Sequence, residues 1–239
     1  MFKLQKGERW ALCALLSIWI CVIIPHSIPA DGQTIAAEAG ARRPVLILDP
    51  GHGGTDGGAV SVTGQRESAI NWQITRRAYD LALFLGIDAV MTRGTEEIDY
   101  PPELASISAR KKWDTRERVR IVNGIGSGVL VSIHQNCYPG SAPRGAQVLY
   151  RDDETSRTLA QMLQRELSAA IPGTDKRTAS KAGKDIYLMS HVENPAVLVE
   201  SGFLSNNAEA LLLESLAHQK KIAMIITGVY YVFTGDETA

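Results

Sequence analysis

Short apolar runs of strand type alternate along the chain with segments of helical spacing, and this alternation restricts the folds open to it. Strands that are separated by helices usually pair in parallel and are covered on both sides of the sheet. We therefore expect a single α/β domain, with a mostly parallel, twisted sheet of about six strands and helices on both faces. The strand-like runs are rich in Val, Ile and Leu and lie at 44–49, 87–92, 129–134, 145–150 and 196–200.

The helices between these runs are predicted from apolar residues at near-helical spacing. Ser68 is a candidate cap for the first helix, in which Ile70, Ile74 and Ala78 fall on one side. A second helix of this kind is predicted at 155–171, and the last at 216–232.

The middle of the chain gives weaker local signals. Asp114, with Glu117 three residues later, has the spacing of a capping box, so a helix is expected to begin there. Residues 93–113 would then form a charged loop. Further along, a basic loop is expected at 176–184 and a short strand at 186–189.

The composition is that of an ordinary globular protein. The chain has 239 residues, of which 45% are apolar, and a formal net charge of −1. Near-neutral charge gives no indication of nucleic-acid binding, so we expect no nucleic-acid partner. A disulfide framework is excluded, because Cys13 and Cys21 lie in the apolar N-terminal run and leave Cys137 alone.

The N-terminus predicts export from the cytoplasm. Basic residues precede an uncharged run from Trp10 to Ile24, and a proline follows it. This order is typical of a signal peptide or an N-terminal membrane anchor at 1–30; the run is shorter than the ~20 residues that a spanning helix prefers. Residues 31–43 are interpreted as a linker and 44–235 as the folded domain. We expect an extracytoplasmic protein, secreted or anchored to the membrane.

The first strand runs into a glycine-dense loop at 50–59, which carries His52 between Asp49 and Asp56. Glycines allow tight turns and let a ligand approach the backbone closely. Polar residues at the carboxyl end of a buried strand also lie where open α/β sheets place their sites. The loop alone does not distinguish a binding site from a plain turn with an incidental histidine. The question is which other residues join His52.

Three strand ends carry His52, His134 and Glu200, and Glu67 precedes the first helix. If the strands are parallel neighbours, their carboxyl ends meet at one edge of the sheet. Two imidazoles and one carboxylate, with a fourth position open for water, form the ligand set of a catalytic zinc. A further carboxylate is needed to move protons, and Glu200 is the natural candidate. Spacing alone does not say which glutamate is the ligand and which is the base.

The site residues belong to a series of sequence blocks. These blocks are 49–54, Glu67 with Asn71, 92–93, Arg118 with Asn123, 132–136 and 200–206. In this order they resemble the zinc-dependent N-acetylmuramoyl-L-alanine amidases of the Amidase_3 type, over residues 45 to about 232. The resemblance implies that 44–235 is the catalytic domain and that one zinc ion is bound by His52, Glu67 and His134. It also implies that Glu200 is the catalytic residue.

Other polar residues near these blocks have supporting roles in our interpretation. Asp49 and Asp56 are expected to order the loop or to surround the ligand His52. Asn136 is a candidate for contact with the substrate or the ligands. Arg93 and Arg118 are interpreted as structural ion-pair partners rather than as groups that hold the substrate.

Within the family, residues 145–150, 187–188 and 195–199 most resemble the germination-specific, or sporulation, branch. That branch removes peptide side chains from the spore cortex so that muramic-δ-lactam can form. The resemblance thus implies hydrolysis of the amide bond between N-acetylmuramic acid and L-alanine in peptidoglycan. Ser201 departs from the branch, which often has cysteine there, but no required role falls on this position.

Two alternative functions remain at this point. One is a general amidase of cell-wall remodelling or cell separation, and the other is a non-catalytic peptidoglycan-binding module with the same fold. The presence of all three ligand candidates and of Glu200 argues against the second. Remodelling amidases often carry wall-binding repeats, for which the folded part leaves no room. We therefore expect an exported activator protein as a partner, and contact with the membrane if the N-terminal segment is not cleaved.

Overall fold

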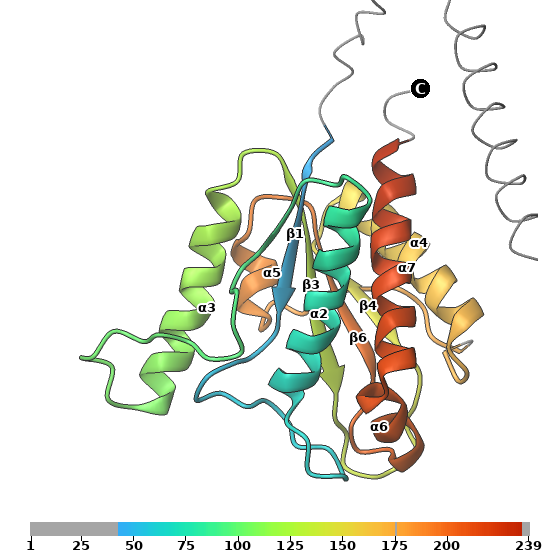
Figure 1. Cartoon of the computed structure of the whole chain (residues 1–239), viewed down its shortest axis with the longest axis horizontal. Coiled ribbons are helices and arrows are strands. Elements are labelled where there is room, and N and C mark those ends of the chain that lie inside the picture. Colours follow the sequence, from blue (N-terminus) through green and yellow to red (C-terminus); the bar gives the residue numbers. More distant parts are fainter. Residues whose placement is uncertain (1–42, 175, 236–239) are drawn as a thin grey trace, which may run out of the picture. The chain divides into compact units, whose positions relative to one another are not determined.

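A computed structural model describes residues 43–174 and 176–235 (Figure 1). The segment expected to direct export, at 1–30, and nearly all of the expected linker lie outside the described residues. Among the residues that the structure describes, no helix combines the length and the apolar character needed to cross a membrane.

A single sheet of six strands forms the centre of the described chain, in the order β2-β1-β3-β6-β4-β5. All neighbouring strands are parallel except β4 and β6, which are antiparallel. The expected α/β fold with a mostly parallel, six-stranded sheet is therefore confirmed. The strands are β1 Val45–Pro50, β2 Ala89–Met91, β3 Gly128–Asn136, β4 Gln147–Tyr150, β5 Ser180–Lys181 and β6 Ala196–Phe203.

Helices cover both faces of this sheet, as expected (Figure 1). Alternate residues of each strand point to opposite faces, so Leu46 and Leu48 of β1 pack with α2, α4 and α7. Ile47, between them, packs on the other face with Val122 of α3 and Leu188 of α5. The described helices are α2 Glu67–Phe84, α3 Ile107–Asn123, α4 Glu154–Ala170, α5 Tyr187–His191, α6 Asn207–Glu214 and α7 Leu216–Gly235.

The helix that was expected to begin at Asp114 begins earlier. α3 starts at Ile107, and the side chain of Ser106 caps it by accepting a hydrogen bond from the backbone N–H of Ala109 at 3.1 Å. Asp114 lies inside the helix and pairs with Arg118, four residues on, so its carboxylate is used for an ion pair rather than for a cap. The prediction of a loop as far as 113 was wrong.

The prediction of a strand at 186–189 was also wrong. These residues enter the short helix α5, and the narrow strand β5 lies instead in the segment expected to be a basic loop. A short apolar run does not distinguish a strand from a turn of buried helix by its periodicity. Here the packing of Leu188 and Met189 against the sheet decides the conformation.

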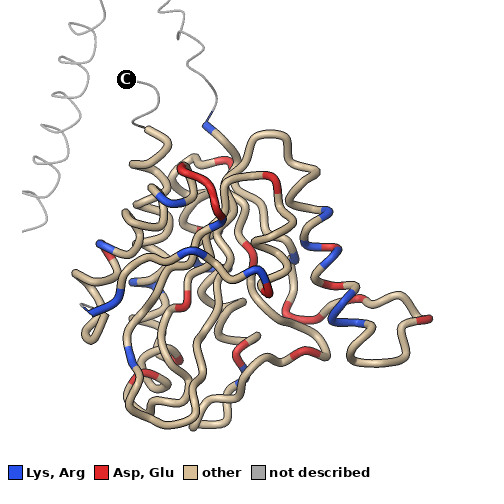
Figure 2. Tube along the Cα trace, turned by 180° about the vertical axis from the view of Figure 1, so that it is seen from behind, with Lys and Arg blue, Asp and Glu red and all other residues tan. Residues whose placement is uncertain are grey.

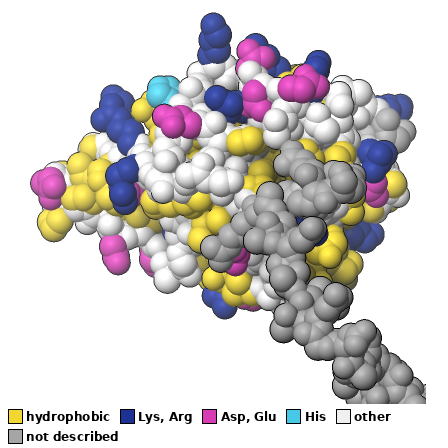
Figure 3. All heavy atoms as spheres, turned by 90° about the horizontal axis from the view of Figure 1, so that it is seen from above, with side chains coloured by type: hydrophobic (Ala, Val, Ile, Leu, Met, Phe, Trp, Pro, Cys, Tyr) yellow, Lys and Arg dark blue, Asp and Glu magenta, His cyan; other side chains and the backbone are white. Residues whose placement is uncertain are grey.

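Four strands, β1, β2, β3 and β6, point toward one end of the sheet, at the lower edge in Figure 1, whereas β4 and β5 point the other way. Figure 3 shows the opposite end, where charged side chains of both signs are interspersed with hydrophobic ones. The polar residues that follow β1 and end β3 therefore gather at the carboxyl end of the sheet.

Candidate metal centre

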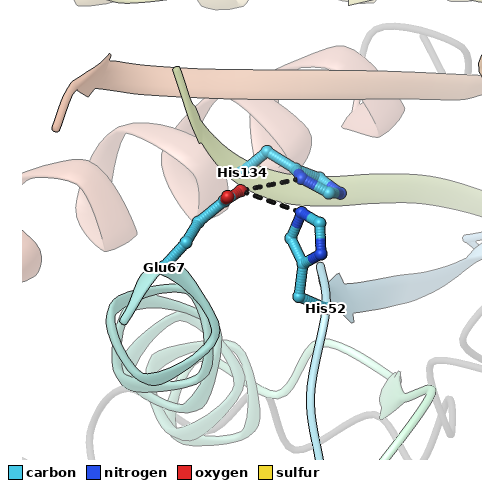
Figure 4. Close-up of side chains that lie close together, drawn as sticks. All are labelled: His52, Glu67 and His134. Carbon is cyan, nitrogen blue, oxygen red and sulfur yellow. Dashed lines mark hydrogen bonds and ion pairs between the residues drawn. The ribbon is translucent and has the colours of Figure 1, made fainter. Parts of the chain in front are cut away.

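His52, Glu67 and His134 converge at the carboxyl end of the sheet (Figure 4). One potential ligand atom from each lies within 4.8 Å of the others. Oε1 of Glu67 is 3.1 Å from Nδ1 of His134 and 3.3 Å from Nε2 of His52. The structure thus brings together three side chains that are far apart in the sequence, and it positions them to bind a metal.

These separations match the dimensions of a small tetrahedral metal site. Zinc bonds of about 2.0–2.1 Å in a tetrahedron place neighbouring ligand atoms about 3.3 Å apart. The two distances from Glu67 Oε1, 3.1 and 3.3 Å, are close to that value. Two nitrogens and one oxygen are also the donor types that zinc accepts. The residues present therefore fit the ion that the family resemblance implies.

The backbone and a carboxylate hold His52 in position. Its φ is 58°, the only positive value of a non-glycine residue among those described. Nδ1 lies 2.9 Å from Oδ2 of Asp56, whose other oxygen pairs with Nζ of Lys111 at 3.1 Å. A carboxylate on one imidazole nitrogen orients the ring and fixes which nitrogen is free for a metal. The free nitrogen here is Nε2, the atom that faces Glu67.

Glu67 is held by backbone and amide donors at the first turn of α2, where the helix dipole favours a negative charge. Its Oε2 accepts from the backbone N–H of Ala59 at 3.0 Å, and its Oε1 accepts from that of Gln135 at 3.2 Å. Asn71, one helical turn later, donates to Oε1 at 3.4 Å. These bonds fix the carboxylate without using a metal.

Interactions between the carboxylates and the histidines shift the pKa values of His52 and Glu67 in opposite directions. Burial alone would lower the pKa of His52, but hydrogen bonds to Asp56 and Glu67 and the charges of both carboxylates raise it to about 9. Burial would raise the pKa of Glu67, but its hydrogen bonds to the two histidines and their charges lower it strongly. Without a metal, the site is therefore an ionised carboxylate with protonated His52 at neutral pH.

Two glycines are required by close approach to the ligands. A Cβ atom at Gly51 would collide with the ring of His134. Gly58 has a φ of +65°, and a Cβ there would lie 2.5 Å from Oε2 of Glu67 and 2.8 Å from the ring of His52. The glycine-dense loop thus leaves room for the ligand side chains themselves.

Asp49 stabilises the glycine-dense loop through buried contacts in the protein interior, and not by contact with the metal-ligand candidates. It is fully buried, accepts from Thr92 and Ser132 at 2.6 Å each, and pairs with Arg118 at 3.0 Å. Burial would raise the pKa of Asp49, but Arg118 and the two hydroxyl donors lower it. Arg118 also donates to the carbonyl oxygens of Pro50 and His52, at 2.7 and 2.6 Å. Arg118 is thus a structural ion-pair partner.

Glu200 lies beside the cluster on β6, directly opposite His134 of β3 in the register of the sheet. Its Oε2 is buried and has no hydrogen-bond partner among the described residues. Burial raises the pKa of the Glu200 carboxyl, and the charge of Glu67 adds to this effect, whereas the two histidines oppose it. An unpaired buried carboxylate with a raised pKa is a common feature of acid–base sites.

A cavity of about 300 Å³ opens onto these residues. His52, His134 and Glu200 line it from the sheet side. α3 and α5 form its other wall, with Lys111, Asp114, Thr115, Ile186, Tyr187 and Leu188. The cluster is therefore accessible from one side, as a site that binds a substrate next to a metal must be.

Not every candidate from the sequence reaches this cavity. Asp56 contacts His52 directly, whereas Asn136 ends β3 and its backbone oxygen accepts from Leu204 at 2.8 Å. Arg93 donates to the carbonyl of Pro50 and has no carboxylate partner among residues 43–174 and 176–235, so the ion pair expected for it is not found there. Lys111 and Tyr187 were missed because both fall in segments whose secondary structure was predicted wrongly.

Donor sets of two imidazoles and one carboxylate, open on one side, are typical of hydrolytic metal sites, so fold and site together are those of a hydrolase of the α/β class with a candidate metal centre. Residues 46–229 match the Amidase_3 family model, described as N-acetylmuramoyl-L-alanine amidase. The chain belongs to this family of amidases.

Individual relatives agree with this assignment. The chain is 34% identical over 213 residues to the germination-specific N-acetylmuramoyl-L-alanine amidase of Bacillus subtilis, covering 88% of this chain and 84% of that protein. It is also similar to the CwlD amidase of Clostridioides difficile, solved in complex with the GerS lipoprotein, with a TM-score of 0.76 and 32% identity over 81% of this chain and 99% of that one. LytC of B. subtilis is 27% identical over 85% of this chain, which spans only 38% of LytC.

Proposed function

We propose that this amidase is zinc-dependent and that it hydrolyses the bond between N-acetylmuramic acid and L-alanine in peptidoglycan. His52, Glu67 and His134 would hold one zinc ion, and Glu200 would be the catalytic residue. The observation that carries the proposal is the convergence of the three ligand candidates beside Glu200, in a chain that matches the family along nearly all of its described length. Two of the candidates, His52 and His134, line one cavity together with Glu200.

The roles of the chain's own residues follow from their positions. When bound, zinc polarises the carbonyl group of the substrate and makes water a better nucleophile. Glu200 accepts the proton of the attacking water and delivers it to the nitrogen of the leaving L-alanine. Its raised pKa makes the carboxylate a better base for the first step, and a pKa closer to the operating pH lets the same group give up the proton again in the second. Asp56 keeps the ring of His52 oriented throughout.

We also propose that the substrate is the peptidoglycan of the spore cortex, where removal of the peptide is a step toward muramic-δ-lactam. The support is the 34% identity to a relative named germination-specific, which covers most of both chains. The second candidate is a general remodelling or cell-separation amidase, supported by the similarity to LytC. The two candidate functions predict different preferences: a cortex amidase should process cortex peptidoglycan faster than vegetative peptidoglycan, and a remodelling amidase should not.

Mass spectrometry of muropeptides tests both the reaction and its setting. The purified protein, loaded with zinc, is incubated with cortex and with vegetative peptidoglycan. We expect release of free stem peptides that begin with L-alanine, faster from cortex, and none after chelation of the metal. Products cut elsewhere would contradict the proposed reaction. Equal or faster cleavage of vegetative peptidoglycan would favour the remodelling amidase.

We further propose that the protein acts outside the cytoplasm together with an exported activator protein. The N-terminal sequence supports export, and the CwlD structure shows that a similar amidase forms a complex with a lipoprotein. The purified protein alone is then expected to process cortex slowly. Processing at full rate without any second protein would contradict the need for an activator.

A further inference from the structure

A groove extends the catalytic cavity along α3. Its volume is about 440 Å³, and Lys111, Thr115 and Tyr187 line both the groove and the cavity. The groove continues past Lys112 and Arg116 to Ile107 at the start of the helix. The groove and the catalytic cavity therefore adjoin along α3, so a ligand held beside Glu200 lies next to the groove.

The groove is both cationic and apolar. α3 carries six basic and two acidic residues, and the basic ones recur along it in Figure 2. The two acidic residues are already paired, Asp114 with Arg118 and Glu117 with Arg120. By contrast, Lys112 and Arg116 are exposed and have no ion-pair partner among the described residues.

Apolar side chains lie between these charges. Ile107 is 61% exposed at one end of the groove, and Tyr187 is 38% exposed beside the catalytic cavity. The ring of Tyr187 stacks on His191 with a centroid distance of 3.7 Å, which holds it in place. A groove with fixed apolar contacts and free cations is complementary to an extended peptide that carries carboxylates.

We infer that this groove binds the peptide stem of the substrate and selects stems whose carboxylates are free rather than amidated. The inference rests on the proposed function, because it takes the leaving peptide to begin at the catalytic cavity. An extended chain advances roughly 3.3–3.6 Å per residue, so the residues next to L-alanine reach the groove first. Lys112 and Arg116 form ion pairs with their carboxylates, and Tyr187 packs against the backbone between them.

The test compares two synthetic muramyl peptides that differ only in whether their carboxylates are free or amidated. For the wild-type enzyme we expect a lower KM with the free acid and a similar kcat. The double variant Lys112→Gln/Arg116→Gln should raise KM for the free acid about 5-fold, as expected for two exposed charge contacts, and leave the amidated peptide unaffected. Added salt should reduce the difference between the substrates for the wild type only.

Arg120→Gln is the control, because it removes one positive charge from the same helix outside the groove, compared with two in the double variant. It should leave both KM values unchanged. The inference is overturned if the wild type hydrolyses both peptides with equal KM, or if Arg120→Gln has the same effect as the double variant. If the wild type releases L-alanine peptides from neither substrate nor from peptidoglycan, the proposed function itself fails.

Discussion

Asp56 holds Nδ1 of His52 at 2.9 Å, four residues away along the same glycine-dense loop. The carboxylate is only partly buried, and its second oxygen pairs with Lys111 of α3. One side chain therefore connects a metal-ligand candidate to α3, the helix that lines the groove. The contact directs Nε2 of His52 toward Glu67 and leaves it available to a metal.

Replacing Asp56 should weaken metal binding without unfolding the protein. In Asp56→Ala, the ring of His52 loses the partner that orients it, and loss of such a partner typically lowers metal affinity about 10–100-fold. The measurement is a zinc titration against a competing chelator. Asp80→Ala is the control, since Asp80 forms an exposed ion pair with Arg76 on α2. Equal zinc affinity of Asp56→Ala and the wild type would contradict this role of Asp56.

Metal binding should depend strongly on pH. The pKa of His52 in the metal-free chain is raised to about 9 by its carboxylate partners, against the effect of burial. A histidine must be neutral to bind a metal, so each ion displaces one proton below that pH. Apparent affinity should then rise about tenfold per pH unit up to about pH 9 and level off above it. Calorimetry in buffers of different ionisation enthalpy would measure the proton; no release at pH 7 would refute the expected protonation.

Glu200→Gln should separate catalysis from metal binding. The amide occupies the same space but neither accepts nor delivers the proton, so kcat should fall by about 10²–10⁴-fold. Zinc content should equal that of the wild type, because Glu200 is not among the three converging ligand candidates. Glu193→Gln, at an exposed position shortly before β6, should change neither kcat nor the zinc content. Loss of zinc from Glu200→Gln would instead identify Glu200 as a ligand.

Gly58→Ala should remove the metal site for a steric reason. Gly58 and Gly64 both have positive φ, so alanine at either position costs about 1–3 kcal/mol of backbone strain. Only at Gly58 would the new methyl group collide with Glu67 and His52; at Gly64 nothing lies within 4 Å. Both variants should therefore unfold at lower urea concentration, but only Gly58→Ala should lose zinc. Retention of zinc by both variants would contradict this prediction and show that the loop around Gly58 can shift to accommodate the methyl group.

Much of this arrangement was predictable from the sequence, because strong local patterns coincide with it. β1, β3 and β6 are apolar runs buried on both faces, and a parallel sheet requires such runs. The polar residues after them then had to meet at one edge of the sheet. The order of motifs identified the family, and the convergence of His52, Glu67 and His134 follows from that fold.

The wall opposite the sheet was not predictable in the same way. α3 begins at Ile107, six residues before the end of the segment expected to be a loop, because the cap formed by Ser106 prevailed over the Asp114 signal. α5 is so short that only its packing against the sheet makes it helical. Lys111 and Tyr187 come from these two elements, so the groove could not be seen before the fold was known.

The left-handed backbone of His52 places stability and function in opposition at one residue. A non-glycine side chain in this conformation costs on the order of 1–3 kcal/mol, whereas glycine adopts it freely. The substitution that would relax this loop most, His52→Gly, is thus also one that removes a ligand candidate. A strained histidine at this position is therefore what the proposed role of His52 as a metal ligand leads us to expect, since stability alone favours glycine there.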